Sequence, residues 1–506
     1  MRVTIAPLRP ILSALATGLL AFACGSATVA SGDAGPAATG GSAPNNGAAG
    51  DGENGGAAGD GGNGGAAGDG ENGGAAGDGE NGGAAGDGGD GAALQRRIDD
   101  AIRSIRADTC FAQDDSSACE WADYEVGPAQ FDMAKSTGES ILVIDELGEG
   151  FFPELVRYRN RIRGFYRVSG EGLQSRVLSV HLPKRLGDVL VSFAGPEFIP
   201  AAVLASVGSA ATSVYQKLNL LYFGHGGVIF THLVELTPEQ PLVLLDLAGV
   251  LDLPPLVCAG IDDATLEAAT AHVTAIAASL EQVMAEHQVR FINASFGTTT
   301  ETLITSWSNT CGGALPSTEQ LRQLLHVYDP IYRLLFHSDG VITAHASANL
   351  GSPADYPFDQ VSPQFSNRVR VGYFSSLSSG LDESGRGSLS KTEQFPADGD
   401  ADVYLNWGCE TLGECAERHY EGAGPFGLGS YTLPLMSSSY VNPMALARLI
   451  HLRYSNHGGE PLSNALVQTL RQELTPARCG ADVAQPCVYQ DPIAHLQFEL
   501  NRLHYQ

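Results

Sequence analysis

The chain has 506 residues, and its 57 acidic against 29 basic side chains give a net charge of −28 at pH 7. A surface this acidic repels the phosphate backbone, which excludes nucleic acid as an expected partner. The chain is long enough to form one large hydrophobic core or two domains.

The N-terminus predicts export. Arg2 and Arg9 lie in a first segment without acids, and residues 11–23 are apolar but too short to span a bilayer. Residues 1–23 therefore resemble a signal peptide, and the residues before Cys24 resemble a bacterial lipoprotein cleavage site. We expect Cys24 to carry a lipid that anchors the protein in the cell envelope or at the cell surface, with lipid-free secretion as the alternative. We expect the protein to contact the membrane through this lipid alone.

Residues 24–94 are rich in Gly, Ala and Asp and contain a nine-residue repeat. Its acidic position recurs at Asp51, Asp60, Asp69, Asp78 and Asp87. Calcium-binding β-roll repeats share this period, but they need a large apolar residue that is missing here. We therefore expect a solvated, disordered linker, in which roughly 70 Gly-rich residues reach about 45–50 Å.

The cysteine count predicts disulfides. Nine cysteines occur, and eight remain once Cys24 is set aside, an even number in an exported chain. Eight cysteines allow about 105 connectivities. Proximity along the chain favours the pairs Cys110/Cys119, Cys409/Cys415 and Cys479/Cys487, with Cys258/Cys311 remaining as the fourth. No Cys-x-x-Cys spacing occurs, which argues against a zinc site of that kind.

After a lead-in at 95–140, which holds one local cysteine pair, short apolar runs alternate with helical patterns. Strands are predicted at 141–145, 189–193, 219–223, 242–246, 289–294, 341–345, 369–373 and 402–405. Helices are predicted at 227–237, 264–287, 317–337, 440–453 and 461–474. Continuous apolar strands separated by helices are typical of an α/β fold whose mostly parallel sheet is covered by helices on both faces. We expect residues 141–506 to form this domain.

Three reactive side chains are candidates for the active site. In such a sheet, catalytic residues usually lie beyond the carboxyl ends of the strands. Asp145 ends an apolar run, and His225 follows another and precedes two glycines. Ser439 precedes an apolar helix. Singly, Asp145 would be read as a turn residue and Ser439 as part of a helix cap. Together they can form a nucleophile, because a neutral imidazole takes the proton of Ser and a buried carboxylate fixes the imidazole tautomer.

Over about 141–453 the chain resembles the subtilisin-like serine peptidases, because sequence blocks of that family recur in the same order. The first block is the apolar strand that ends in Asp145, and the second is His225-Gly226-Gly227 with the strand after it. Two further strands lead to Ser295-Phe296-Gly297 and to Asn349. The last block is Ser439 with Pro443 four residues later.

The resemblance implies a subtilisin-like α/β fold and a monomeric serine endopeptidase that hydrolyses protein or peptide substrates. Asp145, His225 and Ser439 would form the catalytic triad, and Asn349 would donate to the oxyanion together with a backbone amide after Ser439. Residues Ser295, Phe296 and Gly297 would line the bound substrate. Calcium sites are common in the family, and calcium is the one cofactor that the resemblance suggests, although no ligand set can be located.

Several residues depart from the family's pattern. Glu146 and Leu147 separate Asp145 from Gly148, and Val228 stands where the family has a second His. Tyr440 follows Ser439 in place of Met. These departures leave a second interpretation open, a catalytically inactive subtilisin-like surface binding protein.

A caspase-like cysteine peptidase is a further alternative, since a strand ending in His-Gly is typical of that family. It would need a cysteine just after the strand at 242–246, and none occurs before Cys258.

Overall fold

The structure is a computed structural model. The described residues are 88–112, 118–132, 138–147, 153–170, 172–195, 198–199, 201–218, 224–237, 239–252, 255–346, 356–359, 365–374, 401–406, 426, 438–474 and 488–489. The predicted strand at 219–223 lies outside them.

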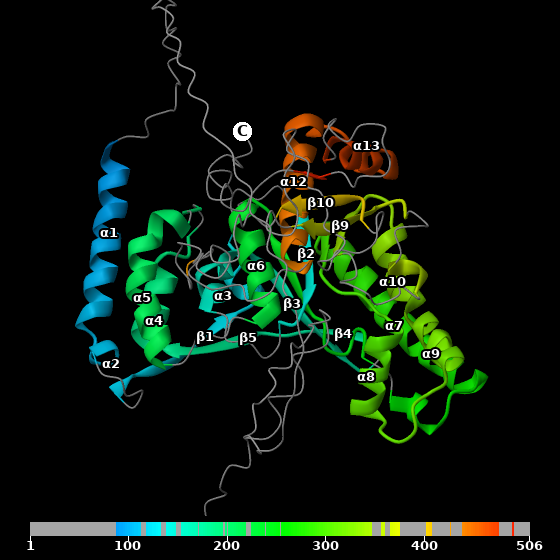
Figure 1. Ribbon diagram of the computed structural model, residues 1–506. Coiled ribbons are helices and arrows are strands. Elements are labelled where there is room, and N and C mark those ends of the chain that lie inside the picture. The colour runs from blue at the N-terminus through cyan, green and yellow to red at the C-terminus, as the bar shows by residue number, and fades with distance from the viewer. Residues whose placement is uncertain are drawn as a thin grey trace, which may run out of the picture. The chain divides into compact units, whose positions relative to one another are not determined.

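A nine-stranded sheet forms the centre of the protein (Figure 1). Its strands, in spatial order, are β11 (Val488–Tyr489), β10 (Val403–Asn406), β9 (Arg368–Phe374), β8 (Ile342–Ala346), β7 (Val289–Ala294), β2 (Ser140–Asp145), β6 (Leu242–Asp246), β3 (Ile162–Ser169) and β4 (Gly172–Ser175). Neighbouring strands run parallel except β3 and β4, which are antiparallel. The predicted α/β class with a mostly parallel sheet is confirmed.

Helices cover both faces of the sheet. Alternate residues of β2 show this, because Ile141 and Val143 belong to one hydrophobic core and Leu142 and Ile144 to the other. The first core contains α4 (Lys184–Ser192), α5 (Ala205–Leu218), α6 (Gly224–Leu236), α12 (Ser438–His457) and α13 (Asn464–Leu474). The second contains α7 (Asp263–Glu286), α8 (Thr300–Thr310), α9 (Thr318–Leu325) and α10 (Asp329–His337). Strand β2 is buried from end to end because it lies between these two layers.

Most predicted elements of the domain are confirmed with small shifts of their ends. Two predictions were wrong. Residues 189–193 are not a strand but the end of α4 and the turn after it. The helix buries one face in the first core, because its apolar side chains have helical spacing: Leu186, Val189, Leu190 and Phe193. The single helix at 317–337 is divided into α9 and α10, because Pro330 in the first turn of α10 has no amide to continue the hydrogen bonds.

The lead-in is built into the first core. It forms α1 (Gly88–Ala107), which begins within the predicted linker, α2 (Thr109–Ala112) and β1 (Trp121–Val126), which pairs antiparallel with β5 (Leu178–Pro183). Side chains such as Ile98 and Ile105 of α1 are buried there. The lead-in is therefore part of the folded domain.

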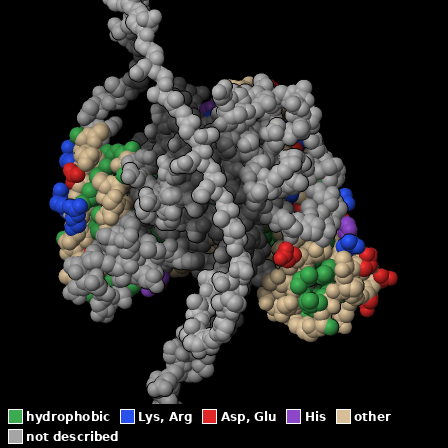
Figure 2. Space-filling view, viewed as in Figure 1, with side chains coloured by type: hydrophobic (Ala, Val, Ile, Leu, Met, Phe, Trp, Pro, Cys, Tyr) green, Lys and Arg blue, Asp and Glu red, His purple; other side chains and the backbone are tan. Residues whose placement is uncertain are grey.

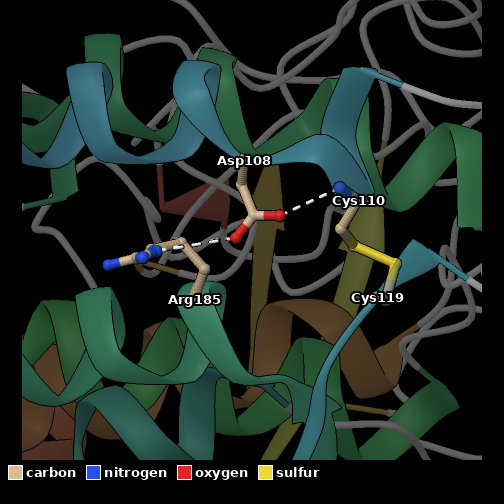
Figure 3. Close-up of a disulfide and its surroundings, with 4 residues drawn as sticks. All are labelled: Asp108, Cys110, Cys119 and Arg185. Carbon is tan, nitrogen blue, oxygen red and sulfur yellow. Dashed lines mark hydrogen bonds and ion pairs between the residues drawn. A yellow bond between two sulfur atoms is a disulfide. The ribbon is translucent and has the colours of Figure 1, made fainter.

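The disulfide between Cys110 and Cys119 links α2 to the residues just before β1. Figure 3 shows Asp108 beside it: one carboxylate oxygen accepts the Cys110 amide at 2.9 Å, and the other lies 3.5 Å from Arg185 of α4. This predicted local pair is confirmed.

The second disulfide, Cys258–Cys311, joins the segment after β6 to the end of α8. It confirms the predicted pair that is distant along the chain. The remaining two predicted pairs stay predictions, because all four of their cysteines lie outside the described residues: Cys409, Cys415, Cys479 and Cys487.

The remaining short elements are α3 (Pro153–Arg157) and the 3₁₀ turns Pro128–Gln130, Arg159–Arg161, Ala201–Leu204, Pro255–Ala259, His326–Tyr328 and Pro357–Asp359. Among the described helices, none combines the length and apolar character needed to cross a membrane. Figure 2 shows Lys and Arg side chains at the edge where α1 lies and Asp and Glu side chains at the edge where α8 and α9 lie.

Candidate active site

Asp145 is the last residue of β2, which lies between β6 and β7. Its side chain is 2% exposed, and its Oδ1 accepts the Glu146 amide at 2.8 Å. The same oxygen accepts a hydrogen bond from Nδ1 of His225 at 2.7 Å. A buried carboxylate on Nδ1 places the proton of a neutral imidazole there, which leaves Nε2 as an acceptor.

His225 is the second residue of α6, and Gly226 explains how this helix comes so close to the end of β2. A Cβ at position 226 would lie 2.5 Å from the carbonyl oxygen of Glu146 and 3.0 Å from Leu147. A side chain at 226 would push the helix away from Asp145. The glycine after the histidine therefore sets the Asp145–His225 distance.

Ser439 lies in the first turn of α12, which packs against α6, β7 and β8. Pro443 stands in the second turn, where its missing amide leaves the Ser439 carbonyl without its helical partner four residues on. The Ser295 hydroxyl donates to that carbonyl at 3.1 Å, and the Ser439 hydroxyl donates to the Ser295 carbonyl at 3.4 Å. Pro443 thereby frees the atom that joins the serine helix to the segment after β7.

The ring of Tyr440, next to Ser439, lies 5.4 Å from the His225 ring, centroid to centroid. Of the three predicted triad residues, the structure bonds Asp145 to His225 and brings the first turn of α12 against the imidazole. The predicted oxyanion donor Asn349 lies outside the described residues, as does Cys24.

Two asparagines that the sequence prediction missed attach α12 to the sheet. Asn442 Nδ2 donates to Asn293 Oδ1 at 3.0 Å, to the Ala344 carbonyl at 3.1 Å and to Ser295 Oγ at 3.4 Å. Asn293 Nδ2 also donates to Ser295 Oγ, at 2.9 Å. Both asparagines are fully buried, so these bonds fix α12 on β7 and β8. One signal was in the sequence: Asn293, near the end of the predicted strand, and Ser295, just after it, are two residues apart, the spacing of side chains on one face of extended chain.

Two acidic side chains, Asp145 and Glu146, lie near the imidazole, and Asp246 interacts with Glu146. Burial raises the pKa of Glu146, and the charge of Asp145 raises it further, whereas His225 lowers it. Burial also raises the pKa of Asp246, at the end of β6, against the effect of Arg167, which lies 2.8 Å away. Negative charge near His225 stabilises the imidazolium that forms when the ring takes a proton.

The chain matches no protein-family model, no curated protein and no solved structure. Function is therefore inferred from the side chains of this site. Among the described residues, no group of three or more His, Cys, Asp or Glu side chains is arranged to hold a metal ion.

Proposed function

We propose that the chain is an exported, surface-anchored serine endopeptidase with a subtilisin-like fold. The observation that carries the proposal is the 2.7 Å bond from His225 Nδ1 to the buried Asp145, with the first turn of α12 against the same imidazole. An orienting carboxylate, a base and a serine from three separate elements are the parts of an activated nucleophile.

In this proposal Ser439 Oγ attacks the carbonyl carbon of the scissile peptide bond while His225 Nε2 takes its proton. Asp145 holds the imidazole tautomer and stabilises the imidazolium, and the ring then gives its proton to the leaving amine. Water hydrolyses the resulting ester by the same steps. The start of the 20-residue helix α12 favours negative charge on the oxyanion, and Asn349 is the expected side-chain donor.

Export is part of the proposal. Two disulfides among the described residues support an oxidising compartment. The signal-like residues 1–23 and Cys24 support a lipid anchor.

One observation favours the second candidate, an inactive binding protein with the same fold. Ser439 is only 2% exposed, so a substrate could reach its hydroxyl only if neighbouring residues moved aside. A serine that nothing can reach serves the packing of α12 alone.

A fluorophosphonate probe separates the two candidates, because it reacts with an activated serine and not with an ordinary one. We expect the folded wild-type protein to be labelled at Ser439, as located by mass spectrometry, and Ser439→Ala to remain unlabelled. Ser438→Ala is the matched control, since it removes the neighbouring hydroxyl of the same helical turn and should leave labelling intact. A folded wild-type protein that stays unlabelled would favour the binding protein.

A further inference from the structure

The segment 295–298, which follows β7, is held on one side by two buried side chains. His345 of β8 donates from Nε2 to the Phe296 carbonyl at 2.8 Å. Asp359, in the turn Pro357–Asp359, accepts the Thr298 amide with Oδ2 at 3.1 Å. Two backbone groups two residues apart are thus bonded from the same side of the segment.

His345 is suited to a permanent bond of this kind. It is 0% exposed, and burial together with Arg368 and Arg370 keeps its pKa well below the ordinary value, so the ring is neutral. A neutral ring has one N–H, and the Phe296 carbonyl fixes it on Nε2. The ring of Phe336, 4.8 Å away between centroids, packs against it.

Asp359 is also held in place, because its backbone amide donates to the Tyr356 carbonyl at 3.0 Å. It is 1% exposed, and the Thr298 hydroxyl bonds the Tyr332 hydroxyl at 2.9 Å beside it. Gly297 leaves room for the carboxylate, because a Cβ at 297 would lie 2.8 Å from Asp359 Oδ1. The carboxylate therefore lies directly under the glycine.

Gly297 is the residue left available. It is partly exposed, whereas Ser295, Phe296 and Thr298 are buried. In an extended chain the amide and the carbonyl of one residue point to the same side, and those of the next residue point to the opposite side. Since the Phe296 carbonyl and the Thr298 amide face the two buried side chains, the amide and carbonyl of Gly297 face away from them, and no described residue bonds them.

We propose that His345 and Asp359 are positioning residues that hold the segment 295–298 so that Gly297 presents its backbone to an extended peptide substrate. The inference rests on the proposed peptidase function and adds to it the groups that set peptide binding. Neither residue contacts the reacting bond; each acts through the backbone that it holds.

The test compares two substrates in the full-length protein. One is a peptide of roughly eight residues, which needs backbone pairing, and the other is a small activated ester, which does not. We expect His345→Leu, which lacks the donor, to lower kcat/KM for the peptide about tenfold, mainly through KM, while ester hydrolysis falls less than about twofold. His345→Gln, whose amide nitrogen is as far along the side chain as Nε2, should restore most of the peptide activity.

Thr343→Val is the matched control. It removes a buried hydroxyl on the same strand that donates to the Leu335 carbonyl at 2.6 Å, away from the segment. We expect it to lower stability without changing the peptide-to-ester ratio. If His345→Leu does not fold, Asp359→Asn gives a second perturbation. Burial raises the pKa of Asp359 to about 7, so this variant is compared with the wild type at about pH 8.5, where the carboxylate is ionised and the neutral amide is the weaker acceptor for Thr298. The ratio should then fall about threefold.

The outcomes separate the two proposals. A wild-type protein that is labelled by the fluorophosphonate, with the peptide-to-ester ratio unchanged in His345→Leu or Asp359→Asn, would overturn the positioning role alone. Loss of peptide and ester activity in equal measure would also overturn it, because that is the result of a general structural defect. A folded wild-type protein without labelling would overturn the peptidase function and this inference with it.

Discussion

Replacing Gly226 by Ala tests how closely α6 must approach β2. The added Cβ would lie 2.5 Å from the Glu146 carbonyl oxygen, whereas real Cβ contacts essentially never fall below 3.0 Å. Helix and strand end must therefore separate by at least about 0.5 Å, which lengthens the 2.7 Å His225–Asp145 bond to about 3.2 Å, the limit of a good hydrogen bond. We expect kcat to fall about 10–100-fold with little change in KM, and the free energy of unfolding to fall by about 1–3 kcal/mol.

The assays are kcat and KM for a peptide substrate, the rate of fluorophosphonate labelling, and thermal unfolding. Gly91→Ala is the matched control: it is also a helical glycine, but no atom lies within 4 Å of the Cβ it would gain. Alanine is the better helix former by about 1 kcal/mol, so this control should be neutral or slightly stabilising. If Gly226→Ala reacts at the wild-type rate and unfolds no earlier than Gly91→Ala, the close approach does not set the geometry of the site.

Three further predictions concern the triad, pH and a disulfide. His225→Ala should abolish most peptidase activity, and Asp145→Asn should reduce it at least about 10³-fold. The double variant should have nearly the same kcat/KM as His225→Ala, because the two residues act together. Additive losses would show that their roles are independent. Burial raises the pKa of Glu235 from 4.5 to about 7. Between these two pH values the folded protein keeps a proton on Glu235 that the unfolded protein has lost. The free energy of unfolding should therefore fall as the pH rises through this range, by at most about 3 kcal/mol. Urea unfolding at pH 5 and pH 8 should show a smaller decrease in Glu235→Gln, and an equal decrease in both proteins would contradict the assignment. Removing the Cys258–Cys311 bridge by a double Ser substitution should cost about 4 kcal/mol because it closes a 53-residue loop, and mass mapping of the unreduced wild-type protein should recover the bridge; a free thiol at either position would rule it out.

Several features of the site were predictable because they depend on local pattern. Asp145 ends an apolar run, and its predicted strand was confirmed, so its place at the sheet's carboxyl edge followed from the sequence. The two glycines after His225 are visible in the sequence, but that the Glu146 carbonyl lies against Gly226 was not predicted. Pairing of Cys258 with Cys311 was predicted by proximity of the other cysteines and is confirmed.

Other features depend on partners that sequence spacing cannot identify. Short strands such as β4 were missed, because a four-residue strand with half its residues exposed has no strong apolar pattern. The apolar run at 189–193 fits a strand as well as a helix over so short a length, and burial of one face against the first core decided for α4.

The sequence by itself determined the α/β class and the strand-terminal position of Asp145, because continuous apolar runs and helical spacing are local properties of the chain. Only the tertiary structure decided that Asn442 bonds Asn293, 149 residues earlier, and that His345 holds the Phe296 carbonyl. Both are polar side chains inside the protein, and a buried polar group is stable only with a partner. Which partner it finds depends on how β7, β8 and α12 pack together, and that is fixed by the two cores as a whole.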